Sequence, residues 1–298
     1  MSLTTDERVA LQRGAGTDLV APSGYQDVPG GERPEVAPPA GPRRRGWRPR
    51  GVVDVLLALV LPVALLAAWQ LAVQAGVLEE SRFSSPGAVL SALVEYAASG
   101  RLWPNLGVSL QRVLLGFTLG SLAALVVGVL VALSRTADRV LSPLLSAVRA
   151  VPSLAWVSVL IIWWGIGEEP KVGLVAIGAF FPVLATLVAG FRQVDTGLLE
   201  VAQAYGLSWR QRVTTVLLPS AAPSLLAGAR LGLNQAWLFL VAAELLGATE
   251  GLGWQLQNAQ RNGQVELVLA TIVLFAVIGK ATDGLLAVVE RRVLARLR

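Results

Sequence analysis

Residues 108–133 read VSLQRVLLGFTLGSLAALVVGVLVAL and carry a single charged side chain, that of Arg112. A helix of about 20 apolar residues is long enough to cross a hydrocarbon core of about 30 Å. Similar apolar stretches lie at about 52–77, 143–166, 172–191, 223–247 and 265–289. The sequence therefore predicts an all-α integral membrane protein with six transmembrane helices.

The composition agrees with this class and excludes several others. Of the 298 residues, 54% are hydrophobic and 15% are charged, whereas soluble domains carry about 25% charged residues. The chain has no Cys and no His, so disulfides, Cys/His zinc sites and Ser-His-Asp or Cys-His catalysis are excluded. We expect no catalytic residue, no metal and no cofactor.

No nucleotide-binding loop is present either. A Walker A motif requires G-x-x-x-x-G-K-[ST], and the only Gly-Lys pair, at 279–280, is followed by Ala281. If ATP drives this protein, a separate chain must bind it.

The charged residues predict domain boundaries and membrane orientation. Residues 1–42 mix Pro, Gly and both charge signs, which is typical of a disordered tail. Five arginines at 43–50 then precede the first span as a cytoplasmic anchor. We therefore divide the chain into a tail at 1–50 and a transmembrane domain at 51–298. Nucleic-acid binding by the arginine run is a weaker alternative, and we expect no nucleic-acid partner.

With the N-terminus inside, 14 basic residues fall on inner segments and four on outer segments. This asymmetry follows the positive-inside rule. It predicts a multi-pass protein of the cell membrane with both termini in the cytoplasm.

The first outer loop, 78–107, is long enough to hold a helix over 86–99. Ser85 is a favourable N-cap, Pro86 suits the first helical position, and Gly100 suits the position after the end. This helix would serve either as a lid over the bundle or as a ledge where an external partner docks.

The cytoplasmic segment 192–222 has two helices separated by a glycine. Asp195 or Thr196 can cap a helix that runs to about Tyr205, and Gly206 can adopt a left-handed conformation after it. Such a pair is either a rigid knob facing the cytoplasm or an ordinary interfacial helix.

The second helix of this segment begins with a capping box. Ser208 and Gln211 have the spacing at which each side chain satisfies a backbone donor of the other. Pro219 is predicted to end the helix.

The same segment resembles the EAA loop of ABC-importer permeases. That pattern is E-A-A, three residues, G, nine residues and I-x-L-P. The chain has Glu200-Val201-Ala202, then Gly206, then VLLP at 216–219, with Val in place of Ala and of Ile. The resemblance spans about 55–298. Shorter motifs match the nitrate/sulfonate/taurine branch: SSP at 84–86, VPSLA at 151–155, WGIG at 164–167, AAELL at 242–246 and GLG at 251–253.

The resemblance implies a type I ABC importer permease with a cytoplasmic coupling helix. It implies two permease copies, two ATPase subunits that bind the ATP, and an external substrate-binding protein. The residues it assigns to ATPase coupling are Glu200, Ala202, Gly206, Arg210 and Pro219. The implied substrate is a small anion, an aliphatic sulfonate or taurine first, with nitrate, bicarbonate, and pyrimidine or flavin precursors left open.

Polar residues inside the fifth span recur at helical spacing. They are Arg230, Asn234, Trp237 and Glu244, with Gln235 at the edge of the stripe. Polar groups within a membrane usually face the bundle interior or a water-filled path. Arg230, Asn234, Gln235 and Trp237 therefore either line the translocation path or hold helices together.

Charged residues at matching depth predict ion pairs. Arg112 in the second span and Glu244 in the fifth are expected to form a structural pair. Exchange of the two charges should then preserve transport. Lys280 and Asp283, three residues apart, are expected to neutralise each other. Arg149 is expected near the inner interface, with its charge reaching the headgroups.

Gly116 and Gly120 form a G-x-x-x-G motif in the second span. This motif predicts close helix packing, either within the chain or with a second copy.

Two other classes of function compete with the importer. An ion-gradient-driven transporter or channel fits the composition, but the EAA spacing and the lack of matched broken helices argue against it. A membrane-embedded enzyme would need intramembrane catalytic clusters, which the sequence lacks.

Overall fold

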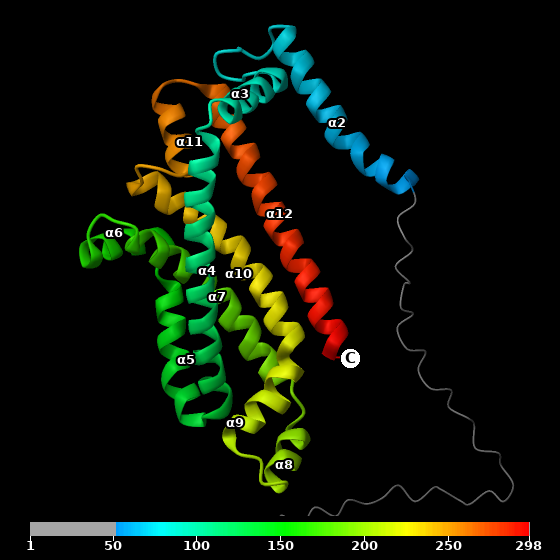
Figure 1. The fold of residues 1–298 in the computed structure, drawn as a ribbon, viewed down its shortest axis with the longest axis vertical. Helices are drawn as coiled ribbons and strands as arrows, with labels where there is room; N and C mark the ends of the chain where they lie inside the picture. The colour runs from blue at the N-terminus through cyan, green and yellow to red at the C-terminus, as the bar shows by residue number, and fades with distance from the viewer. Residues whose placement is uncertain (1–51, 298) are drawn as a thin grey trace, which may run out of the picture. The chain divides into compact units, whose positions relative to one another are not determined.

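The computed structural model describes residues 52–297, and the predicted tail and arginine anchor at 1–50 lie outside this range. The contacts given below are those of Leu56–Arg298, one of the two units into which the chain divides. The described elements are all helical (Figure 1): α2 (Val52–Gln74), α3 (Pro86–Ala98), α4 (Leu102–Leu133), α5 (Arg135–Ala150), α6 (Ser153–Trp164), α7 (Glu169–Arg192), α8 (Thr196–Ala204), α9 (Trp209–Gln211), the π-helical η1 (Arg212–Leu217), α10 (Leu218–Gly247), α11 (Leu252–Arg261) and α12 (Val265–Leu297).

Helices α4, α7 and α10 pack side by side and form the core. Glycines allow the backbones to approach closely. A Cβ atom built on Gly116 would lie 2.6 Å from Cβ of Val175, and one on Gly120 would meet the backbone of Ala176. The predicted G-x-x-x-G motif therefore packs α4 against α7 within the chain.

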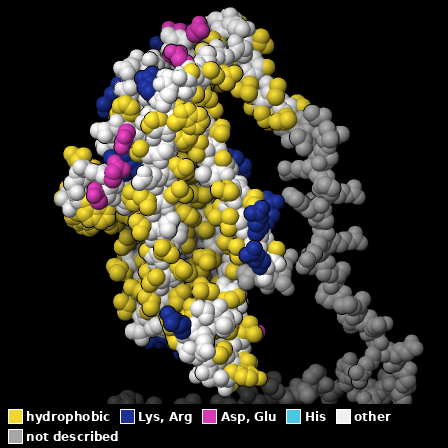
Figure 2. All heavy atoms as spheres, viewed as in Figure 1, with side chains coloured by type: hydrophobic (Ala, Val, Ile, Leu, Met, Phe, Trp, Pro, Cys, Tyr) yellow, Lys and Arg dark blue, Asp and Glu magenta, His cyan; other side chains and the backbone are white. Residues whose placement is uncertain are grey.

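Large apolar side chains remain exposed on the outer faces of these helices. On α4 they include Leu114, Leu119 and Val126, and hydrophobic side chains cover much of the face seen in Figure 2. In water such a surface would be unfavourable, whereas lipid tails solvate it. The burial pattern therefore agrees with a membrane protein.

Among the described residues, four helices are long and apolar enough to span a membrane: Leu102–Leu133, Glu169–Arg192, Trp209–Gly247 and Val265–Arg296. The predicted span at 143–166 is not one straight helix. Helices α5 and α6 cover that region and meet at an angle of 104°. Val151 is extended and Pro152 follows it, because proline disfavours the helical conformation in the residue before it. The count of six spans stays a prediction.

The predicted outer helix is present as α3, with the predicted ends. The Ser85 side chain accepts a hydrogen bond from the Ala88 N–H, and Gly100 has a φ of +74°. Tyr96 is buried beneath α3, while Leu90 is exposed on its other side. Helix α3 thus covers one end of the bundle and also presents an outer surface.

Helix α11 was not predicted. The sequence between the last two spans is short and polar on average, so it has no apolar stretch of span length. Gly251, with a φ of +111°, begins the helix. Leu252 and Ala259 are fully buried, so α11 is an integral part of the α3 end of the bundle.

Candidate functional site

The predicted coupling segment forms a capped helix with a glycine stop. The Asp195 carboxylate accepts a hydrogen bond of 2.9 Å from the Gly197 N–H at the start of α8. Gly206 has a φ of +70° after the helix, and the next residue, Leu207, donates its N–H to the Ala202 carbonyl at 3.0 Å. These bonds satisfy backbone groups at both ends of α8. The Asp195 cap and the left-handed Gly206 are confirmed.

The second predicted helix also begins as expected but does not end at Pro219. Ser208 and Gln211 form the capping box. The helix then continues through π-helical η1 into α10, so that Trp209–Gly247 is one continuous helix. The prediction that Pro219 ends it is wrong. A π-helical turn widens the backbone ahead of the proline, which relieves the clash between its ring and the preceding turn.

The surface of this loop combines charged and apolar side chains. Glu200, Gly206 and Arg210 are exposed, and the exposed fraction of Tyr205 is 82%. Ala202 is only 4% exposed, so it packs inside the loop and offers a partner no surface.

The inner side of the loop joins the membrane core. Val213 and Leu217 of η1 are buried against Val129, Leu187 and Phe191, which belong to α4 and α7. A force on the loop therefore reaches three core helices through packed side chains.

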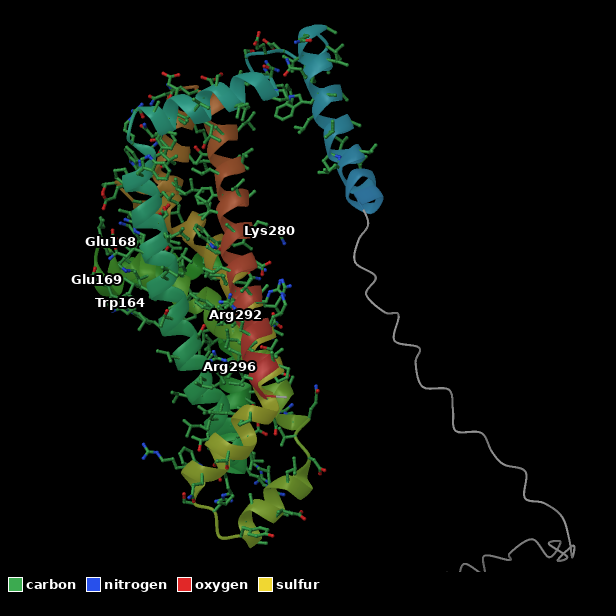
Figure 3. The ribbon with its side chains drawn as sticks, turned by 45° about the vertical axis from the view of Figure 1, so that its right-hand side comes forward. Trp164, Glu168, Glu169, Lys280, Arg292 and Arg296 are labelled. Atoms are coloured by element: carbon green, nitrogen blue, oxygen red, sulfur yellow. The ribbon has the colours of Figure 1, made fainter. Side chains whose placement is uncertain are left out.

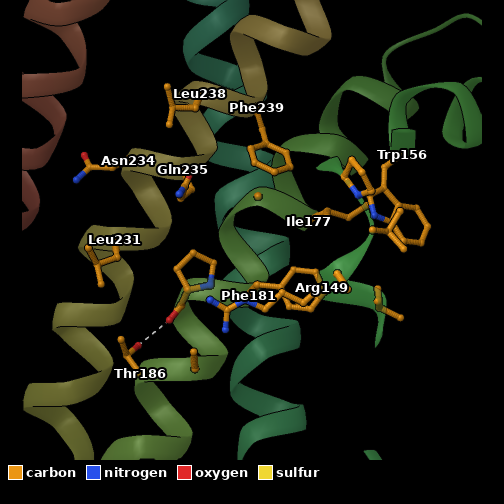
Figure 4. A pocket seen from close by; sticks show the side chains of 17 residues that line it. Arg149, Trp156, Ile177, Phe181, Thr186, Leu231, Asn234, Gln235, Leu238 and Phe239 are labelled. Atoms are coloured by element: carbon orange, nitrogen blue, oxygen red, sulfur yellow. Dashed lines mark hydrogen bonds between the residues drawn. The ribbon is translucent and has the colours of Figure 1, made fainter. Parts of the chain in front are cut away.

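A cavity of about 630 Å³ lies between the α5–α6 bend, α7 and α10. Figure 4 shows its wall, which is largely aromatic and aliphatic. Its polar side chains are Arg149, Thr186, Asn234 and Gln235. The Thr186 hydroxyl donates to the Pro182 carbonyl at 2.8 Å. The structure thus places Asn234 and Gln235 on a cavity wall.

Arg230 and Trp237 lie elsewhere, against α12. Arg230 makes two bonds to the Asp283 carboxylate, at 3.0 and 3.1 Å. Trp237 donates its indole N–H to the Thr282 hydroxyl at 3.0 Å. The predicted polar stripe is therefore divided: two residues line the cavity and two link helices.

Lys280 and Asp283 form the expected ion pair, with their closest atoms 3.6 Å apart. The Lys280 side chain is 84% exposed, as its position on α12 in Figure 3 illustrates. The Arg230 guanidinium is the closer partner of Asp283.

At the α3 end of the bundle, Arg112 is the centre of a buried charge network. Its guanidinium donates to both Glu168 oxygens at 2.6 and 2.7 Å, to Glu244 at 2.7 Å and to the Glu250 carbonyl at 2.8 Å. Lys171 donates a further bond of 2.8 Å to Glu168. The expected Arg112–Glu244 contact is thus part of a larger assembly that also fixes the start of α7.

Glu244 is fully buried and has partners besides Arg112. It accepts hydrogen bonds from the Ser109 hydroxyl at 2.8 Å and from the Gly253 N–H at 2.7 Å. Ser109 in turn accepts from the Leu252 N–H at 2.8 Å. Side chains of α4 and α10 therefore satisfy the first backbone donors of α11.

Glu168 joins this network from the turn before α7 (Figure 3). Its hydrogen bonds with Arg112 hold the pKa of its carboxyl at about 2, below the usual 4.5. Glu168 was not predicted as a member, because a charged residue just outside a predicted span carries no signal of an intramembrane partner.

Comparisons with known proteins agree with this architecture. The sequence profile described as "Binding-protein-dependent transport system inner membrane component" matches residues 116–295. The putative aliphatic sulfonates transport permease protein SsuC of Bacillus subtilis is 38% identical over 85% of this chain and 89% of its own length. The taurine transport system permease protein TauC of Escherichia coli is 34% identical over 84% and 93%.

Solved structures show the same fold. An inward-facing structure of the MetNI methionine ABC transporter matches with a TM-score of 0.56 at 22% identity, covering 68% of this chain and 98% of that one. The helical fold, the apolar spans and the sequence relatives therefore lead to one conclusion: the chain belongs to the binding-protein-dependent transport inner-membrane components, as an ABC-importer permease subunit of the sulfonate/taurine branch.

Proposed function

We propose that this permease carries a small anion, an aliphatic sulfonate or taurine first, into the cell at the expense of ATP bound by a separate ATPase subunit. The names of the two relatives support this substrate class. The lack of a Walker A motif in the sequence supports a separate ATPase. In this proposal the chain performs no chemistry and binds no cofactor.

The observation that carries the proposal is the construction of the coupling loop. It is capped, it presents Glu200, Tyr205 and Arg210 to a partner, and its second helix continues without interruption into α10. The same helix carries Asn234 and Gln235 on the cavity wall. A displacement of the loop by an ATPase would therefore reach the cavity along one continuous helix.

The complete transporter would contain two copies of this chain, two ATPase subunits and an external substrate-binding protein. The ATPase would contact the α8–α9 loop, and both chain termini would lie on the cytoplasmic side, as the distribution of basic residues predicts. The binding protein would dock at the α3 end. ATP binding would draw the two loops together and open the cavity outward, and hydrolysis would return it to the inward-open state.

Purification of the tagged chain from its native membrane in a mild detergent tests this assembly. We expect a stoichiometric ATPase, which Glu200→Arg or Gly206→Pro would remove from the purified complex. Glu95→Arg is the matched control, because Glu95 is exposed on α3 at the opposite end of the bundle. The copurified binding protein would then be titrated with ethanesulfonate, taurine, nitrate and bicarbonate.

Absence of any ATPase from a folded, dimeric preparation would contradict the proposal. It would favour the ion-gradient-driven transporter instead.

A further inference from the structure

Arg149 lies in the last turn of α5, beside the bend into α6, and not at the start of that helix near the coupling loop. Helix α5 starts at Arg135 and runs back along α4 (Figure 1). At 1.5 Å per residue, Arg149 is about 21 Å along the helix from that start. An arginine side chain is too short to return its charge across that distance. A cation at such depth usually faces a water-filled path.

Arg149 also has no carboxylate near it. Within the described residues, Arg112, Lys171, Arg230 and Lys280 each form an ion pair in the membrane domain, and Arg149 forms none. No Asp or Glu lines its cavity. The structure thus holds a positive charge in the membrane domain without a counter-ion from the described part of the chain.

A neighbouring hollow also contains Arg149. It is a recess of about 400 Å³ that Ser142, Ser146 and Arg192 line as well. Arg192 pairs with Asp138 at 3.6 Å, so Arg149 is the lining cation that forms no ion pair within the described residues. Arg192 ends α7 at the coupling-loop end of the bundle. Arg149 therefore lines both hollows, and the smaller one also reaches Arg192.

From this geometry we propose that Arg149, with the side-chain amides of Asn234 and Gln235, forms a binding site for a small organic anion on the wall of the translocation path. The guanidinium and amide N–H groups suit the oxygens of a sulfonate. The aromatic rings of Trp156, Phe181 and Phe239 line the same cavity and suit an apolar chain attached to the anion. An aliphatic sulfonate has both parts, whereas nitrate and bicarbonate have only the charge.

This site rests on the proposed function, and its test separates the two. Complexes that contain the copurified ATPase and binding protein would be placed in liposomes, and ATP-driven accumulation of radiolabelled ethanesulfonate measured. We expect Arg149→Gln to reduce accumulation about tenfold and Arg149→Glu to abolish it, while Arg149→Lys stays within about threefold of wild type. Arg139→Gln is the matched control, because Arg139 is exposed on the same helix and lines neither hollow.

Gln235→Glu provides a second variant if Arg149→Gln fails to copurify with the ATPase. It leaves the arginine in place and supplies an internal counter-ion, so accumulation should again fall. Wild-type accumulation by Arg149→Gln, or by Gln235→Glu, would overturn the site while leaving the importer intact. A wild-type chain that copurifies with no ATPase and accumulates no anion would overturn the proposed function and the site with it.

Discussion

At the α3 end of the bundle, Arg112 donates four hydrogen bonds to two carboxylates and a carbonyl. Arg149, about 21 Å along α5 from the opposite end, lines a cavity with amides and aromatic rings instead. The side chain of Arg112 is 2% exposed, whereas Arg149 is exposed to the cavity. The same residue type therefore occupies two environments that differ in whether the protein supplies the negative charge.

This difference separates a structural role from a ligand-binding one. Removing one member of a buried ion pair leaves an uncompensated charge and costs on the order of 3 kcal/mol. Removing a cation that has no ion-pair partner in the protein leaves no uncompensated charge, so this cost does not arise. Variants in the charge network should accordingly change stability, and variants at the cavity should change transport.

The largest effect on stability is expected from Glu244→Ala. It leaves the Ser109 hydroxyl and the Gly253 N–H without their buried acceptor and removes one carboxylate from Arg112. We expect a loss of about 3 kcal/mol, measured as a lower unfolding temperature in detergent. Glu95→Ala, at an exposed site on α3, should have almost no effect, and equal losses for the two variants would contradict a structural role for the network.

Exchange of Arg112 and Glu244 should not restore that stability. A glutamate at 112 would face Glu168, and an arginine at 244 would face the donors of Ser109 and Gly253. The expectation that exchange of the two charges preserves transport is therefore revised. A swapped variant with wild-type unfolding temperature would show that the two residues act as an isolated pair.

A smaller loss is expected from Gly251→Ala. Its Cβ would lie 2.7 Å from Arg112 Nη1 and would also contact the Glu244 carboxylate, at a φ of +111°. Gly100→Ala is the control, because Gly100 has a φ of +74° and a Cβ added there would have no other atom within 4 Å. We expect Gly100→Ala to lose about 1 kcal/mol of stability through backbone strain. For Gly251→Ala we expect about two to three times that loss. Equal shifts in unfolding temperature would mean that the network tolerates the added methyl group.

The smallest effect is a pH dependence at Glu168. Because its folded-state pKa is lowered to about 2 from 4.5, its contribution to stability is complete above about pH 4.5 and is lost as the pH falls towards 2. The difference in unfolding temperature between wild type and Glu168→Gln should be constant from about pH 5 to 7 and shrink below about pH 4.5. A constant difference down to about pH 3 would contradict the Arg112–Glu168 pairing.

Local capping signals predicted the helix ends well. Ser85, Asp195, Gly206 and Ser208 act on backbone groups within a few residues, so their roles depend little on the remaining fold. Counting residues from the span ends was enough to match the depths of Arg112 and Glu244.

Features that depend on several elements at once were missed. The cavity requires the bend at Pro152 and the meeting of α7 with α10, and a span that looked continuous gave no sign of it. The helix continues through Pro219, and a π-helical turn lies just before it. The role of Glu168 likewise depends on its partner Arg112 in a distant helix. The role assigned to Arg149 depends on the lack of an acidic residue among those that line its cavity.

The most direct test gives the two arginines the same substitution. Arg112→Gln and Arg149→Gln would be purified in parallel, and the unfolding temperature of each compared with wild type. The account predicts a fall of about 5–10 °C for Arg112→Gln and no fall for Arg149→Gln, whose defect should appear in anion accumulation alone. A fall for Arg149→Gln as large as that for Arg112→Gln would show that Arg149 is a structural charge too, and would contradict the distinction between the two regions.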